Sequence, residues 1–138
     1  MTPEQVTLVK DTWAQVAPIS EQAADLFYGK LFELNPDYRD LFKGDMKSQG
    51  KMLMSVLNTA VTSLDKLDTI VPVVQDLGRR HVDYGVKEED YAVVAEALLW
   101  TLGQGLGESF TDEVKEAWTL TYTTLAGVMI EAANSEAA

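Results

Sequence analysis

The chain has 138 residues, a net charge of −11 and 46% apolar residues, so we expect one globular domain over residues 1–138. This acidity argues against nucleic acid or an anionic membrane surface as a partner. The absence of cysteine excludes disulfides, thiolate nucleophiles and iron–sulfur clusters. The sequence also shows no apolar run of membrane-spanning length and no signal peptide, so the expected location is the cytoplasm.

Every segment of the chain predicts helix, and none alternates like a strand. Apolar residues recur at intervals of three and four, as on one face of a helix. Pro18 and the Asn35-Pro36 pair mark breaks, and the segment KGDMKS is expected to be a polar loop. The sequence therefore predicts an all-α domain of six to seven helices, over about 2–16, 20–34, a short turn ending near 42, 52–64, from 69 or 70 through 81, 88–106 and 111–133.

His81 is the only histidine in the chain, and it lies on an apolar helical face. Ile70, Val74, Leu77 and His81 are spaced by four, three and four residues, so they share the expected buried stripe. Arg80 is expected at the edge of that face. A lone histidine in such a place is more often a packed core residue than a metal ligand, so this pattern alone leaves its role open.

The number of protein ligands that each metal site needs limits the kinds of site in which His81 could take part. Zinc sites normally need three or four protein ligands, and one histidine without cysteine does not supply them. No nucleophile elbow accompanies the histidine. Haem needs only one protein nitrogen, because the porphyrin supplies four ligands and leaves a sixth position for a gas.

Four stretches in order, FYGKLFELNPDYRDLF, KMLMSVLNTAVTSLDKL, LGRRHVDYGVKEEDY and AWTLTYTTLAGVM, carry a resemblance that covers about residues 6–130. The chain resembles a single-domain bacterial globin, similar to the haem domain of flavohaemoglobins and to neuroglobin-like chains. This resemblance implies the globin fold, haem b as cofactor and His81 as the proximal iron ligand.

The same resemblance assigns further residues. Tyr28 and Gln49 match the residues on the distal side, where a gas binds. The other matches are expected to contact the haem, with Arg80 or Lys51 as partners of its propionates: Phe42, Leu53, Leu77, Val86 and Tyr91. Each of these residues also has an ordinary interpretation, as a core, rim or solvated side chain.

Three functions follow from this resemblance as expectations. The first is reversible binding of dioxygen or another diatomic gas. The second is nitric-oxide dioxygenation or nitrite chemistry with an external reductase. The resemblance weakens the self-sufficient form of that chemistry, because no reductase module follows the globin part and Leu120 stands where flavohaemoglobins have a glutamate. The third is a haem-free globin-like sensor or interaction domain.

Overall fold

The computed structural model describes residues 2–41, 45–83 and 87–137, and within these ranges it is helical and contains no strand. The all-α prediction is therefore confirmed. The elements are α1 (Pro3–Val16), η1 (Ala17–Ile19), α2 (Ser20–Leu34), η2 (Pro36–Leu41), α3 (Met46–Thr62), η3 (Leu64–Thr69), α4 (Val71–Asp83), α5 (Asp90–Leu106), η4 (Gly107–Ser109) and α6 (Asp112–Ala137).

Local signals explain most helix ends, and two expected boundaries were wrong. Thr2 caps α1 by accepting a hydrogen bond from the Gln5 amide, with Pro3 in the first turn. Asp45 caps α3 in the same way through the Lys47 amide, so the second half of the expected loop KGDMKS is helical. Helix α6 continues to Ala137 instead of ending near residue 133.

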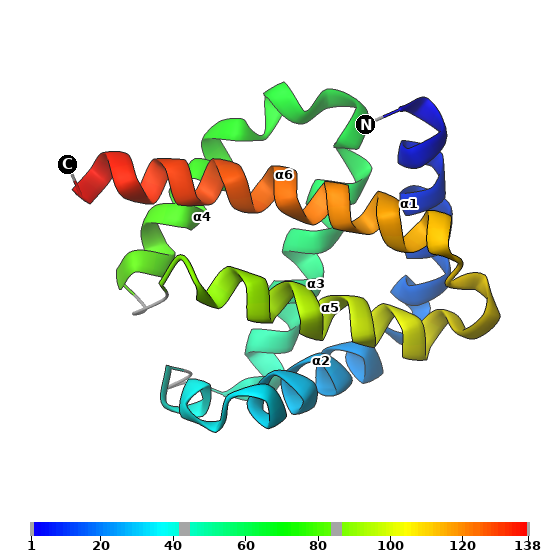
Figure 1. Ribbon diagram of the computed structural model, residues 1–138, viewed down its shortest axis with the longest axis horizontal. Coiled ribbons are helices and arrows are strands. Elements are labelled where there is room, and N and C mark those ends of the chain that lie inside the picture. The colour runs from blue at the N-terminus through cyan, green and yellow to red at the C-terminus, as the bar shows by residue number, and fades with distance from the viewer. Residues whose placement is uncertain (1, 42–44, 84–86, 138) are drawn as a thin grey trace.

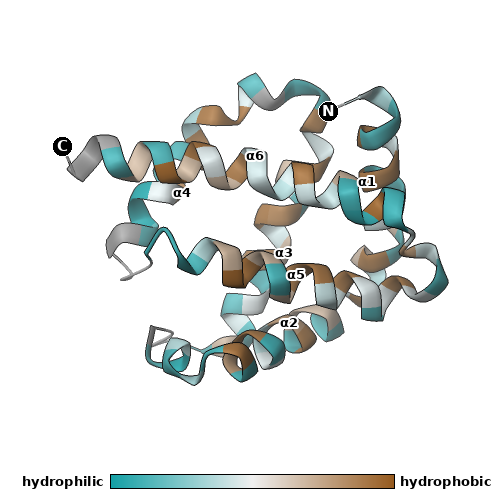
Figure 2. Ribbon diagram, viewed as in Figure 1, coloured by the Kyte–Doolittle hydropathy of each residue, from teal (hydrophilic) through white to brown (hydrophobic). Residues whose placement is uncertain are grey.

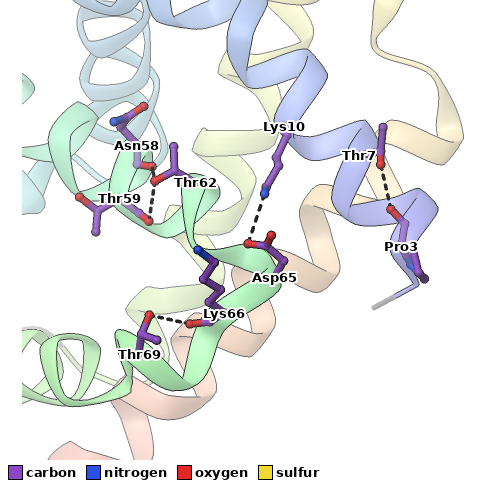
Figure 3. A network of polar contacts seen from close by, with 9 residues as sticks. All are labelled: Pro3, Thr7, Lys10, Asn58, Thr59, Thr62, Asp65, Lys66 and Thr69. Atoms are coloured by element: carbon purple, nitrogen blue, oxygen red, sulfur yellow. Dashed lines mark hydrogen bonds and ion pairs between the residues drawn. The ribbon is translucent and has the colours of Figure 1, made fainter.

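The helices pack around each other in crossing pairs (Figure 1). Helix α6 lies along α4 and α1, α5 lies on α2, and α3 packs on α2 and α1. Apolar residues concentrate on the helix faces turned toward these neighbours, and polar residues on the outer faces (Figure 2). On the outside, Lys10 of α1 reaches Asp65 of η3 at 3.3 Å, which ties the first helix to the segment after α3 (Figure 3).

Most of the buried apolar residues in the described part of the chain fall into two clusters. The larger one, called the main core here, joins α1, α2, α5 and the first half of α6, with Trp118 only 1% exposed. Within it, the Trp118 indole Nε1–H donates to Thr12 Oγ1 at 2.9 Å, which satisfies a buried donor. The smaller one, called the α4–α6 cluster, consists of Ala60, Ile70, Val74 and Met129 with partly buried neighbours.

Two glycines allow helices to approach each other closely. A Cβ added to Gly50 of α3 would lie 2.9 Å from the Ala24 Cβ of α2. A Cβ added to Gly78 of α4 would lie 2.6 Å from the Met129 Cα of α6. These distances leave no room for a larger residue, so the two glycines set the spacing of α2 with α3 and of α4 with α6.

The apolar stripe expected on α3 is only partly buried. Ala60, Val61 and Leu64 are buried as predicted, but Met52 is 58% exposed and Val56 is 42% exposed. The second half of the stripe thus supplies core packing, while the first half leaves an apolar face uncovered by the chain itself. None of the described helices is long and apolar enough to cross a membrane.

Candidate functional site

His81 lies in the last turns of α4, where a backbone carbonyl one helical turn earlier fixes the tautomer of its imidazole. His81 Nδ1 is 2.7 Å from the backbone carbonyl oxygen of Leu77. A carbonyl only accepts, so Nδ1 carries the proton, and Nε2 is the nitrogen with which the ring would bind a metal. Desolvation by burial lowers the pKa of His81, although the hydrogen bond to Leu77 opposes this effect. The imidazole is therefore held neutral, the form that coordinates iron.

The plane of the imidazole is supported by an aromatic neighbour. The ring of Tyr91 lies 6.2 Å from that of His81, centroid to centroid, at an interplanar angle of 25°. Tyr91 is itself anchored, because the Tyr122 hydroxyl of α6 donates to its backbone carbonyl at 2.7 Å. Sequence reasoning missed Tyr122, since no local pattern links residues from different helices.

Tyr28 and Gln49 meet where α2 crosses α3. The Tyr28 hydroxyl lies 3.4 Å from the backbone carbonyl oxygen of Gln49, to which it donates a long hydrogen bond. Burial raises the pKa of Tyr28 to about 12, so its phenol stays a protonated donor at neutral pH. The close approach of Gly50 to Ala24 holds the two helices at this spacing. The structure thus brings together the two positions that the sequence predicted as distal.

The helices that carry Gln49 and His81 also carry apolar side chains that the chain leaves open. On α3, Met52 and Val56 follow Gln49 by three and seven residues, which places all three on one helical face, and both apolar side chains are exposed. On α4, Val73 is 61% exposed. The two helices that carry Gln49 and His81 thus each expose apolar surface.

The other predicted contacts are placed as follows. Leu53 is partly buried against the main core, and Leu77 is partly buried against the α4–α6 cluster. Arg80 forms an ion pair with Asp76 at 3.0 Å on the surface, with 60% of its side chain exposed. Phe42 and Val86 lie outside the described residues.

Three further observations concern alternatives. Leu120 is exposed on α6, so its side chain lies on the outer face of that helix. No group of three or more metal-binding side chains occurs among the described residues. One cavity of about 440 Å³ lies between α1, η1 and α3, and another of about 640 Å³ lies between α1, η1, α2 and α3. Neither His81 nor Tyr28 lines either cavity. They are therefore separate from the histidine site.

A helical domain with a tautomer-fixed histidine on α4 and a Tyr28–Gln49 contact between α2 and α3 has a donor set that suits haem. The family model named Globin matches residues 25–129, and the chain belongs to the globin family. Haem b is the cofactor of this family, and the donor set described above fits it.

Individual relatives agree with this assignment. The chain is 31% identical over 133 residues to a flavohemoprotein of Bordetella parapertussis, covering 94% of this chain and 33% of that protein. It is 29% identical to Neuroglobin-1 of Oncorhynchus mykiss, covering 94% of this chain and 90% of that one. A bacterial globin structure from Campylobacter jejuni superposes with a TM-score of 0.85 at 25% identity, covering 97% of each chain. The chain thus spans about a third of the flavohemoproteins that it matches.

Proposed function

We propose that this globin reversibly binds dioxygen or another diatomic gas, with His81 as the proximal ligand and Tyr28 and Gln49 on the distal side. The observation that carries the proposal is the His81–Leu77 hydrogen bond, because it fixes a neutral imidazole with Nε2 as the coordinating nitrogen. The absence of a second histidine in the sequence leaves no other imidazole to fill the sixth position.

When bound, haem b supplies an iron whose sixth position takes the gas, and the chain supplies the surroundings. His81 would bind the iron through Nε2, and its ring is oriented by the Leu77 carbonyl and the Tyr91 ring. On the other side of the iron, the Gln49 amide would be one donor to the gas, and the Tyr28 phenol would be a second by exchanging its long hydrogen bond to the Gln49 carbonyl for one to the gas. Apolar residues such as Leu53 would exclude water from the cofactor. Arg80 at the surface is the candidate partner of a propionate, and it would exchange its ion pair with Asp76 for that contact.

The ferrous protein is expected to be five-coordinate and open to ligand. An absorption spectrum of the purified ferrous form, with and without carbon monoxide, measures this directly. A low-spin bis-imidazole spectrum in the monomer would contradict the proposed coordination. A purified protein that takes up no haem would instead support the hypothesis of a haem-free sensor or interaction domain.

Removing the Tyr28 hydroxyl should speed release of dioxygen. A hydrogen bond to a charge-bearing acceptor contributes roughly 1.5–3 kcal/mol, which corresponds to about a 10- to 150-fold faster dissociation in Tyr28→Phe. Gln49→Leu, of similar volume, removes the amide, and we expect a smaller effect because the glutamine side chain has more rotatable bonds. Stopped-flow dissociation rates measure both variants.

Carbon monoxide is the internal control for the Tyr28 and Gln49 variants, because it accepts hydrogen bonds weakly. Its dissociation rate should change much less than that of dioxygen. Equal changes for both gases would show that the two residues act by size alone. Unchanged dioxygen release in both variants would show that their side chains do not reach the gas.

The second candidate function is nitric-oxide dioxygenation with an external reductase. The 31% identity to a flavohemoprotein favours it. The chain aligns with a third of that protein, and for this function we propose that electrons come from a supplied reductase. Conversion of nitric oxide to nitrate over many turnovers, with a supplied reductase, would support this function, and a single turnover per haem would reject it.

A further inference from the structure

Tyr38 and Asp90 form a partly buried polar contact between distant parts of the chain. The Tyr38 hydroxyl donates to Asp90 Oδ1 at 2.7 Å, and the Tyr38 side chain is only 7% exposed. The other carboxylate oxygen of Asp90 accepts a hydrogen bond from the Lys87 amide at 2.8 Å. Burial and then the hydrogen bond to Asp90 raise the pKa of Tyr38 to about 12, so the phenol remains the donor. A short hydrogen bond to a carboxylate is among the stronger polar contacts in proteins.

This contact links the two sides of the proposed haem site. Tyr38 belongs to η2, which packs on α2, the helix that carries Tyr28. Asp90 begins α5 and directly precedes Tyr91, whose ring stacks on His81. A bond across 52 residues of chain therefore joins the distal helix pair to the support of the proximal histidine.

Tyr91 is thereby fixed from two directions. Its own carbonyl accepts from the Tyr122 hydroxyl of α6, and the residue before it is held by Tyr38 of η2. The backbone at Tyr91 is thus held on both sides, and this limits the movement of the ring that stacks on the imidazole. Loss of either attachment would leave Tyr91, and with it His81, freer to move.

We propose that Tyr38 and Asp90 are positioning residues for the cofactor, acting as a clamp that keeps the distal and proximal sides together and slows haem loss. The clamp rests on the proposed function, because it acts through His81. Neither side chain needs to touch the haem for this role.

The test compares haem loss with fold stability in matched variants. Tyr38→Phe removes only the donor, Asp90→Ala removes the acceptor, and the double variant closes the cycle. Thr12→Val is the control, because it removes the buried acceptor of Trp118 between α1 and α6, another tertiary hydrogen bond outside the clamp. Haem loss is measured by transfer to excess apomyoglobin, and stability by urea unfolding of the apoprotein.

We expect Tyr38→Phe and Asp90→Ala each to speed haem loss by about tenfold or more, the factor that corresponds to one charge-assisted hydrogen bond. The double variant should lose haem no faster than about the worse single variant, because both remove the same bond. Thr12→Val should unfold more easily but lose haem at nearly the wild-type rate. Additive effects, or equally fast haem loss in Thr12→Val at matched stability, would overturn the clamp.

The apoprotein gives a readout that does not involve the cofactor. The Asp90 and Tyr91 amides donate to the carbonyls of Lys87 and Glu88, and Tyr38→Phe should speed their hydrogen exchange more than Thr12→Val does. Unchanged exchange would contradict the clamp. If wild type binds haem and His81→Ala releases it while Tyr38→Phe changes nothing, the clamp alone is wrong. If wild type binds no haem, the proposed function fails first, and the clamp fails with it.

Discussion

Replacing His81 with alanine should raise the rate of haem loss by more than about a hundredfold. Disturbing a group that merely orients a metal ligand costs about 10- to 100-fold in metal affinity, and removal of the ligand itself should exceed this. The chain offers no second histidine and no cysteine as a substitute. Transfer of haem to excess apomyoglobin, followed at the intense violet absorption band, measures the rate.

A second variant separates loss of the ligand from loss of the fold. His81→Gly leaves a space of the size of an imidazole, so added imidazole should slow haem loss again and restore the five-coordinate ferrous spectrum. Haem retention at the wild-type rate in His81→Ala, with an unchanged ferrous spectrum, would refute the assignment of the proximal ligand.

Replacing Gly78 with alanine should destabilise the fold more than the same replacement at any other glycine in the described helices. The added Cβ would lie 2.6 Å from the Met129 Cα and 2.8 Å from its carbonyl carbon, and backbone atoms cannot move aside as a flexible side chain can. Overpacking of this kind costs about 2–3 kcal/mol, measured by urea unfolding of the apoprotein. The variant should also lose haem faster, because α4 must shift away from α6 and carries His81 with it.

Gly127→Ala is the matched control for this prediction. Gly127 lies in α6, and a Cβ added there would meet nothing within 4 Å. Alanine is favoured over glycine inside a helix by roughly 0.5–1 kcal/mol, so this variant should be slightly more stable than wild type. Equal stability losses at Gly78 and Gly127 would show that the contact with Met129 does not set the helix spacing.

The sequence predicted the helices well, because their apolar periodicity is a local property of the chain. It failed where one cap decided the boundary, since Asp45 starts α3 inside a segment that its polar composition marked as a loop. It also overestimated burial at Met52 and Val56, because periodicity identifies an apolar face but not what covers that face.

The candidate site was partly accessible to sequence reasoning. The spacing of His81 with Leu77 placed the histidine on the apolar face of its helix, and the structure adds the hydrogen bond between them. The resemblance selected Tyr28 and Gln49, which the structure brings together. The supports of Tyr91 could not be predicted, because Tyr122 and the Tyr38–Asp90 pair meet only through tertiary packing.

The division of the buried residues into a main core and a smaller α4–α6 cluster has a consequence for cooperativity. Among the described residues, the helix that bears His81 packs on a cluster with four buried members, whereas α1, α2 and α5 share the larger core. We expect the apoprotein to open around α4 at a lower free energy than global unfolding requires, with faster amide exchange there. Cofactor binding would then raise the free energy of this local opening more than that of global unfolding. The main core and the α4–α6 cluster would come closer to unfolding in a single transition.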